Sequence, residues 1–463
     1  MQFNSIPFLV FLPLVFAVYW ALGRRAQNLF LIAASYLFYG WWDWRFLGLI
    51  FLSSLVDFVA GRAIETRRSP RAWLGVSLAV NLGALGVFKY LDFGIESFAR
   101  LLAGLGFEPH LETLSLILPV GISFYTFQTL SYTIDVYRGR IRATGDPVAF
   151  FAFVAFFPQL VAGPIERAGN LLPQFLRERR FDPTQALDGA LQMLYGLWLK
   201  TVVADGLAPI ADAGFSDPAT GSAALVATYA FAFQIYGDFA GYSHIGIGCA
   251  RMFGFSLMQN FACPYFSRNP REFWQRWHIS LSTWFRDYVY IPLGGSRRGR
   301  MRNRINVLVT FGLSGLWHGA GLNFIAWGIY HGLLLLGDRV RSAGGRRERT
   351  GSRGATPAGA IATLVTFHLV CLGWIFFRSP DLAHAWTMIR ALGGGWSAAS
   401  VADGTLLWIP LLLAVEGLRR GRSHPLDLAR SPAPVRWAAC GLLVLAIVLF
   451  GRVDVVPFIY FQF

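Results

Sequence analysis

The sequence has little charge for its length. Of its 463 residues, 14% are charged, whereas 55% are hydrophobic and 16% are aromatic. The mean hydropathy is +0.46, which is too apolar for an ordinary soluble domain. This composition predicts a polytopic membrane protein.

Cysteine is also scarce. The four cysteines, Cys249, Cys263, Cys371 and Cys440, are isolated from one another and form no CxxC pair. No histidine stands at metal-ligand spacing from any of them. The sequence therefore indicates neither a disulfide framework nor a zinc site, and we expect no bound metal.

Acidic residues are few as well. The chain has 26 Asp and Glu residues against 41 Lys and Arg residues, which gives a formal net charge of +15. Basic residues cluster between apolar stretches, as at 339–353 with six arginines and one glutamate, and this is typical of cytoplasmic loops. They do not alternate with exposed aromatic residues, so we expect no nucleic-acid partner.

The beginning of the sequence lacks the features of a cleavable signal peptide. It has neither a basic region nor a small-residue cleavage site, so residues 6–22 are predicted to form a retained membrane helix. Apolar stretches of spanning length predict roughly eleven membrane helices in all. Two less apolar stretches, 93–106 and 381–392, predict interfacial helices, and no internal repeat of the kind found in many transporters is visible.

Polar and broken stretches lie among the apolar ones. Stretch 114–137 is interrupted by Pro119 and Gly121 and is rich in hydroxyl side chains, so we expect it to face a protein interior or a wet cavity. A buried structural helix explains it equally well. Farther along, prolines and glycines break the chain near Glu166, which predicts a re-entrant segment that the protein must shelter from lipid.

Four titratable residues stand inside apolar stretches. Asp57 is predicted to be a buried, hydrogen-bonded carboxylate, because no second titratable group is near it in sequence. Lys200 is predicted to extend its ammonium group to a membrane interface. Asp238 and His244 lie on one stretch and are candidates for a buried pair.

Stretch 260–330 organises the rest of the chain, because it places two histidines, His278 and His318, beside apolar helices. Ionisable side chains at membrane depth mark functional sites by default. The alternative is that both histidines are structural residues of the interior.

The first part of this stretch carries a helix start. Asn269 is a predicted N-cap, Pro270 fits the first helical position, and Glu272 completes a capping box. Apolar residues then recur at three- and four-residue spacing up to Tyr288, which predicts one amphipathic helix. On such a helix Ser282 shares a face with the first histidine.

The second part predicts a membrane helix at 305–317. Gly312, Gly315 and Gly319 fall three and four residues apart, so one face of this helix has no side chains. We expect that face to form an open slot, in which a long thin ligand would lie against bare backbone with His318 at one end.

Several of these motifs resemble a known family. They are VGISFYTFQTLSYTIDVYRG, FFPQLVAGPIERAGNLLPQF, PYFSRNPREFWQRWHISLSTWFRDYVYIPLGG, GLWHGAGLNFIAWGIYHG, CLGWIFFRS and PFIYFQF. The sequence is similar to the membrane-bound O-acyltransferase (MBOAT) family, within the bacterial branch of the alginate O-acetylation membrane protein and its relatives that act on other envelope polymers. The similarity covers nearly the whole chain, and RWHISLS and LWHG are its most specific motifs.

The resemblance implies an all-α integral membrane protein of the bacterial inner membrane, with membrane helices around a central funnel or tunnel. It implies one domain, 1–463, with a catalytic core at about 114–337 and peripheral helices at 1–113 and 338–463. It also implies that His318 is the catalytic histidine and that His278 is the second motif histidine. At His244 the family more usually has aspartate, so no role is assigned there.

The chemistry follows from a buried imidazole. Apolar surroundings favour the neutral form, which is a base, so His318 can take a proton from a hydroxyl that attacks a thioester. His278 can bind the acyl carbonyl, orient His318 or contact the acceptor, and the sequence does not choose among these roles. No nucleophile elbow predicts a covalent acyl-enzyme.

The donor predicted from the resemblance is acetyl-CoA or another acyl-CoA, used as a substrate, and no permanently bound cofactor is expected. A basic turn is placed to meet its phosphates if the turn is cytoplasmic: Arg297, Arg298, Arg300, Arg302 and Arg304. The candidate substrate-lining residues are Gly312, Gly315, Trp317, Gly319, Trp277, Ser282 and Asp287.

The predicted function is transfer of an acetyl group across the membrane to a hydroxyl of an extracytoplasmic polysaccharide or partner protein. Alginate-type exopolysaccharide is the leading acceptor, and peptidoglycan or teichoic acid is the alternative. Besides membrane lipid, the expected partner is an extracytoplasmic acyltransferase of the serine-hydrolase type. Two other functions stay open: a transporter or flippase of an acylated carrier or sugar, and a non-catalytic scaffold.

Overall fold

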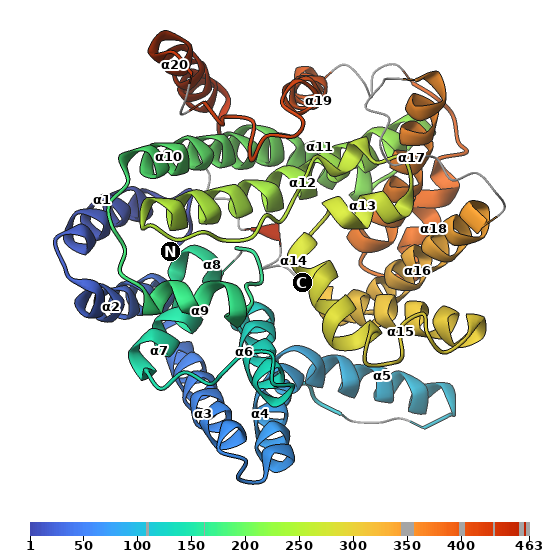
Figure 1. Ribbon diagram of the computed structural model, residues 1–463. Coiled ribbons are helices and arrows are strands. Elements are labelled where there is room, and N and C mark those ends of the chain that lie inside the picture. Colours follow the sequence, from blue (N-terminus) through green and yellow to red (C-terminus); the bar gives the residue numbers. More distant parts are fainter. Residues whose placement is uncertain are drawn as a thin grey trace. The chain divides into compact units, whose positions relative to one another are not determined.

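The computed structural model describes residues 1–107, 111–161, 163–343, 356–397, 403–428, 431–452 and 458–459, with side chains omitted at 340–343. These residues form helices and connecting turns, with no β-strand among them (Figure 1). The predicted loop at 339–353 lies outside this part from residue 344 onward, as does most of the motif PFIYFQF.

The described α-helices are α1 (Ile6–Trp20), α2 (Arg24–Asp43), α3 (Leu47–Glu65), α4 (Pro70–Leu85), α5 (Leu91–Gly104), α6 (Ile122–Tyr137), α7 (Pro147–Ala155), α8 (Phe157–Leu160), α9 (Ala168–Leu176), α10 (Pro183–Trp198), α11 (Asp205–Ser216), α12 (Gly221–Met252), α13 (Pro270–Arg276), α14 (Ile279–Phe285), α15 (Arg300–His318), α16 (Leu322–Ala343), α17 (Pro357–Arg378), α18 (Leu382–Ala391), α19 (Trp408–Leu418) and α20 (Ala433–Phe450). Three π-helical segments interrupt them: η2 (Gly86–Tyr90), η3 (Leu199–Ala204) and η5 (Arg286–Tyr290).

Four helical stretches in the described chain are long and apolar enough to cross a membrane: Arg24–Glu65, Pro70–Gly104, Pro357–Arg378 and Ala433–Phe450. Two shorter helical stretches, Ile6–Trp20 and Gly404–Leu418, are also apolar. Many of their large hydrophobic side chains are exposed, as expected where lipid is the solvent. The prediction of an all-α membrane protein is therefore confirmed, whereas the number of about eleven spans stays a prediction.

The chain divides into two compact units. The first comprises residues 1–190 and 246–258, and the second comprises residues 191–245 and 259–463. Both candidate histidines belong to the second unit. The single-domain assignment with a core at 114–337 stays a prediction.

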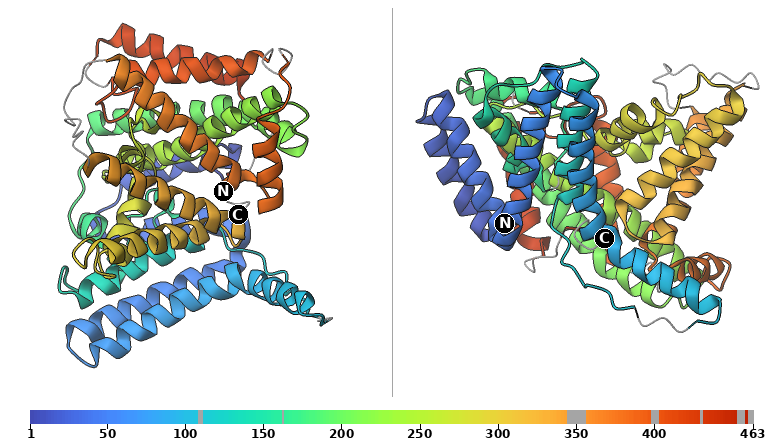
Figure 2. Two further views of the ribbon diagram at one scale, coloured as in Figure 1. Left: turned by 90° about the vertical axis from the view of Figure 1, so that its right-hand side faces the viewer. Right: turned by 90° about the horizontal axis from the view of Figure 1, so that it is seen from below.

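In the first unit, α6 packs against the antiparallel helices α3 and α4, which lie side by side in Figure 2. Asp57 on α3 accepts hydrogen bonds from the Ser77 hydroxyl (2.6 Å) and the Asn81 amide (2.9 Å) of α4. The Ser77 hydroxyl also lies 2.9 Å from the Thr133 hydroxyl on α6. This confirms Asp57 as a buried, hydrogen-bonded carboxylate, and it gives the polar α6 a buried structural role.

The broken segment after α8 is sheltered inside the first unit. Glu166 is fully buried and accepts hydrogen bonds from the side-chain amide of Asn170 (2.7 Å) and from the backbone N–H of Met258. Irregular backbone in a membrane protein is tolerated where protein covers it. The expectation that protein shelters this segment is confirmed.

In the second unit, two sequence predictions are wrong. Lys200 does not reach an interface: it is fully buried, and its Nζ lies 2.7 Å from Asp205 Oδ1 and 2.8 Å from Asp238 Oδ1. His244 pairs with Gln192 (3.1 Å) rather than with Asp238. Lys200 lies in the π-helical segment η3, where the 3.6-residue period does not apply. For His244 a helical period identifies a face without identifying the residue that packs on it.

Candidate active site

The segment that carries His278 is two short helices rather than the single amphipathic helix predicted. The helix start is as expected: Asn269 caps α13 by accepting the Glu272 backbone N–H (2.9 Å), with Pro270 in the first position. The Glu272 carboxylate reaches back to the backbone N–H of Arg268 (2.7 Å). However, α13 ends at Arg276, and α14 begins at Ile279.

His278 forms the break between these helices in a left-handed conformation, with φ 41° and ψ 55°. A residue with a Cβ is uncommon in this region, which costs about 1 kcal/mol or more of backbone strain. Such strain persists only where the surrounding structure enforces it, and it is found most often at functional sites. The backbone thus marks His278 independently of its sequence motif.

Asn260 enforces this turn. Its backbone oxygen accepts the N–H of Ile279 (2.9 Å), and its side-chain oxygen accepts the hydroxyl of Ser280 (2.9 Å). Its amide group donates to the Ser243 hydroxyl on α12 (3.1 Å). The side chains of Asn260, Ser280 and Ser243 are all buried, so these bonds replace those that water would make. The turn at His278 is therefore tied to both its own segment and α12.

The second unit brings the two candidate histidines together. The ring centroids of His278 and His318 lie 6.2 Å apart, and the two side chains are 0% and 2% exposed. His318 is the last residue of α15, so its position follows from the length of that helix. The two histidines are 40 positions apart in sequence and meet because α13 packs against α16, which in turn packs against α15.

Aromatic rings enclose both imidazoles. The His278 ring contacts Phe239 of α12 edge to face, with centroids 4.5 Å apart. The His318 ring meets Trp327 of α16 at 5.0 Å and Phe377 of α17 at 5.4 Å. Sequence reasoning did not identify these wall residues, because they lie on three other helices. The available signal was the place of Trp327 in the motif GLWHGAGLNFIAWGIYHG and of Phe377 in the motif CLGWIFFRS.

The glycine face of α15 is not the open slot that the sequence predicted. A Cβ at Gly315 would collide with the backbone carbonyl of Phe324, and one at Gly319 would collide with the Phe324 ring. Conversely, a Cβ at Gly328 of α16 would collide with the carbonyl of Phe311. The absent side chains thus serve close packing of α15 on α16. A spacing of small residues predicts a close approach without saying whether a ligand or a helix makes it.

The remaining predicted lining residues have different environments. Trp317 precedes His318 and lies against the His278 ring, with centroids 5.9 Å apart. Trp277 is buried, and its backbone oxygen accepts the Ser282 hydroxyl (3.3 Å). Asp287 in η5 pairs with Arg286 (2.8 Å) at a partly exposed position. Contact of these residues with substrate stays a prediction.

The basic turn that the sequence singled out, residues 297–304, is non-helical at 297–299 and continues into the first residues of α15, and it is exposed. The side chains that the sequence singled out all lie at the surface: Arg297, Arg298, Arg300, Arg302 and Arg304. Next to them, Tyr290 and Arg339 both donate to the Asn303 side-chain oxygen, at 2.7 and 3.0 Å. The turn is therefore attached to η5 and α16 while its arginines are available to a ligand.

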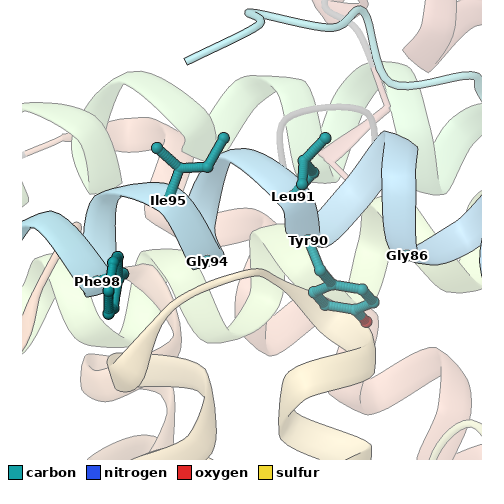
Figure 3. Close-up of a pocket in the computed structure, with 6 residues that line it drawn as sticks. All are labelled: Gly86, Tyr90, Leu91, Gly94, Ile95 and Phe98. Carbon is teal, nitrogen blue, oxygen red and sulfur yellow. The ribbon is translucent and has the colours of Figure 1, made fainter. Parts of the chain in front are cut away.

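Two other features of the described chain do not resemble an active site. Its histidines, cysteines and carboxylates form no group that could hold a metal ion. An open pocket in the first unit is shown in Figure 3, where it is lined by Gly86, Tyr90, Leu91, Gly94, Ile95 and Phe98. It contains no group that would act as a base near neutral pH, so the histidine pair remains the candidate.

Comparisons with known proteins show which family the chain is similar to. The family model described as MBOAT, membrane-bound O-acyltransferase family, matches residues 140–377, which include both histidines. The chain is 39% identical to the probable alginate O-acetylase of Azotobacter vinelandii over the full length of both chains. It is 40% identical to the corresponding Pseudomonas aeruginosa protein over 92% of this chain and 83% of that one.

A more distant relative extends the comparison. The peptidoglycan O-acetyltransferase of Helicobacter pylori is 36% identical over 85% of this chain and 80% of its own length. The resemblance predicted from the motifs is confirmed by the family match and by relatives that align with nearly the whole chain. The chain therefore belongs to the membrane-bound O-acyltransferase family and is an O-acyltransferase of membranes.

Proposed function

We propose that this enzyme transfers an acetyl or similar short acyl group from cytoplasmic acyl-CoA across the bacterial inner membrane to a hydroxyl of an extracytoplasmic polysaccharide. Alginate-type exopolysaccharide is the leading acceptor, because relatives aligned over most or all of the chain are named as alginate O-acetylases. The observation that carries the catalytic assignment is the pair of buried histidine rings 6.2 Å apart.

In the proposed reaction His318 is the general base. Its ring lies against Trp327 and Phe377, and in the neutral form it can accept a proton. The acceptor oxygen attacks the thioester carbonyl as His318 removes the hydroxyl proton. The carbon–sulfur bond then breaks, and the thiolate of CoA takes up that proton. General base catalysis typically increases the reaction rate by about 10²–10⁴-fold.

His278 supports this reaction in one of three ways. It binds the acyl carbonyl, orients His318 or contacts the acceptor. Its strained backbone and the Asn260 hydrogen bonds hold the ring in one direction, which suits each of these roles. Turnover and KM of His278 variants separate them, because loss of acceptor binding raises KM for the acceptor, whereas loss of carbonyl binding lowers kcat.

The donor is proposed to approach from the side of the basic turn. Five exposed arginines near the start of α15 match the phosphates of coenzyme A, which are the strongly anionic part of that substrate. Acyl-CoA is consumed as a substrate, and no permanently bound cofactor is required. In this proposal about eleven membrane helices surround a funnel that leads from the donor side to the histidines.

The acceptor side is proposed to involve a second protein. Acyl transfer to a polymer outside the membrane needs a carrier or an acceptor enzyme there, and a membrane-anchored acyltransferase of the serine-hydrolase type suits this step. The Helicobacter pylori relative is named for peptidoglycan, which makes peptidoglycan the first alternative acceptor, with teichoic acid as another.

A transporter or flippase of an acylated carrier is the second candidate function. The observation that favours it is the buried set of Lys200, Asp205 and Asp238, because buried charges are common along ion and substrate pathways. A transporter would move an acylated molecule without consuming a thioester. Consumption of acyl-CoA therefore separates the two functions.

The decisive experiment follows labelled acetyl-CoA into envelope polymer in membranes with equal amounts of wild-type chain, His318→Ala or His368→Ala. His368 is a matched control, because it is an exposed histidine on α17. We expect label to fall by about 10² or more in His318→Ala and to stay near wild type in His368→Ala. Equal label in all three would remove His318 from catalysis and favour a transporter or scaffold.

A further inference from the structure

A buried group of charges lies in the second unit, close to the candidate histidines. Lys200 of η3 pairs with Asp205 of α11 and Asp238 of α12, at 2.7 and 2.8 Å. The three residues are at most 3% exposed. One ammonium group thus faces two carboxylates, and breaking such a buried pair is strongly destabilising. One carboxylate would be enough to pair with the lysine, so the presence of a second buried carboxylate calls for an explanation.

Asp238 has a second partner, which explains why this carboxylate is present in addition to Asp205. Its Oδ2 accepts the backbone N–H of Ile459, 2.7 Å away, while its Oδ1 faces Lys200. Hydrogen bonds to an ionised acceptor are stronger than those between neutral groups. Ile459 is 221 positions away from Asp238 in sequence. The carboxylate therefore joins the segment near the end of the sequence to the middle of α12.

The side chain before Ile459 continues the contact along α12. Phe458 is fully buried, and its ring lies 4.5 Å from that of Tyr242 and 5.7 Å from that of Phe239, measured between centroids. Tyr242 follows Asp238 by four positions, so the two share a helix face. Phe458–Ile459 is thus held along α12 by one charged hydrogen bond and two ring contacts.

Phe239 connects this segment to the candidate site. Its ring contacts that of Phe458 and also meets the His278 imidazole, edge to face at 4.5 Å and 82°. Closely packed rings hold each other in place. Removing the Phe458 side chain would leave a cavity next to Phe239, and the Phe239 ring could tilt into it. The His278 ring would then lose its edge-to-face contact with Phe239, while its contacts with Trp317 and His318 remain.

We propose that Asp238 is a positioning residue for acyl transfer, which anchors Phe458–Ile459 so that Phe458 holds Phe239 against His278. Lys200 lies within ion-pair distance of both Asp205 and Asp238 and so holds the Asp238 side chain in place. The inference rests on the proposed function for its effect on turnover, whereas the anchoring itself is independent of it. A charge group with a purely structural role would change stability without a selective effect on kcat.

The anchor is tested by thiol accessibility in the purified full-length chain. Ile459→Cys is introduced where the four native cysteines are replaced by alanine, and reaction with a maleimide is timed with Asp238 intact, as Asn or as Ala. We expect Asp238→Ala to speed labelling about tenfold or more by releasing the segment. The labelling rate of Asp238→Asn should lie between those of the intact and alanine forms, because the amide oxygen of asparagine still accepts the Ile459 N–H. Equal rates in all three would overturn the anchor.

The positioning role is tested by steady-state acetyl-CoA consumption per folded molecule. For Phe458→Ala we expect kcat to fall about tenfold or more, with KM for acetyl-CoA changed by less than about twofold. Phe458→Leu, which refills most of the space, should recover much of that loss. Phe107→Ala is the matched control, because Phe107 is 63% exposed in the first unit.

Two results would contradict the positioning role. The first is that Phe458→Ala and Asp238→Asn both turn over as fast per folded molecule as the wild type. The group of Lys200, Asp205 and Asp238 would then have a purely structural role. A wild-type chain that does not consume acetyl-CoA would overturn the proposed function and the effect on kcat together. In that case the maleimide rates would still decide whether Asp238 anchors the segment.

Discussion

The backbone at His278 is strained, and this strained conformation positions the imidazole. His278 adopts a left-handed conformation that glycine adopts without cost, and Asn260 holds the turn with three hydrogen bonds. The sequence predicted a histidine on the face of a continuous helix. The structure instead puts it at the junction of α13 and α14, where its direction is set by packing.

Substitutions at this residue should separate stability from activity. His278→Ala and His278→Gly both remove the imidazole, but only glycine also relieves the left-handed strain. We expect His278→Gly to be more stable than His278→Ala by about 1 kcal/mol, with acyl transfer lowered equally in both.

Thermal unfolding of the two variants in one detergent, beside acetyl-CoA consumption, checks this prediction. Here the alanine variant is the control for loss of the ring. An alanine variant as stable as the glycine variant would mean that the backbone at residue 278 is unstrained.

At the scale of elements, α15 and α16 form the closest helix pair near the site. Gly315 and Gly328 allow the two backbones to meet, and His318 follows at the end of α15. Side chains are excluded from this contact because each would strike a carbonyl of the other helix. The position of His318 thus depends on small residues that make no contact with substrate in our proposal.

Two glycines of the same helix provide a matched test. A Cβ at Gly315 would strike the Phe324 carbonyl, whereas one at Gly312 would lie 3.4 Å from Ile329 Cδ1, an ordinary contact. We expect Gly315→Ala to destabilise the protein by about 1–3 kcal/mol and to lower turnover by shifting His318. Gly312→Ala should be neutral or slightly stabilising, because alanine favours helix by up to about 1 kcal/mol.

This prediction is tested by measuring the melting temperature and the turnover of both variants in the same membrane preparation. If Gly315→Ala were as stable and active as Gly312→Ala, the helices would separate easily. The glycine face could then open for a ligand, as the sequence first suggested.

At the scale of the whole molecule, charge is distributed unevenly between the apolar helices and their connections. The excess of 41 basic over 26 acidic residues is carried largely by arginine-rich turns. In the proposed function one of these turns, Arg297–Arg304, attracts the anionic donor, while the others follow the general preference of cytoplasmic loops.

Neutralising that turn should weaken donor binding selectively. With Arg297, Arg298 and Arg300 changed to glutamine, we expect KM for acetyl-CoA to rise about tenfold with kcat nearly unchanged, because charged hydrogen bonds to phosphate are lost. Added salt should raise the wild-type KM more than the mutant KM.

Glutamine at Arg67 and Arg68, which are exposed in the turn between α3 and α4, is the control for loss of positive charge as such. A rise in KM of the same size in this control would assign the effect to general electrostatics. An unchanged KM in the triple variant would exclude the turn as a donor site.

Local and compositional features were predictable from the sequence. Low charge and long apolar stretches determined a helical membrane protein, and the Asn269 cap and the end of α15 at His318 depend on neighbouring residues alone. The motifs around the two histidines determined the family. Each of these features rests on residues close together in the chain, where propensity and pattern act directly.

Only the tertiary structure decided which distant groups meet. It buried Lys200 between two carboxylates, joined Asp238 to Ile459 and brought Phe239 into contact with both Phe458 and His278. It also filled the glycine face of α15 with a neighbouring helix. A period of 3.6 residues identifies a face without identifying its partner, because the partner depends on long-range packing, π-helical shifts and backbone strain enforced from elsewhere.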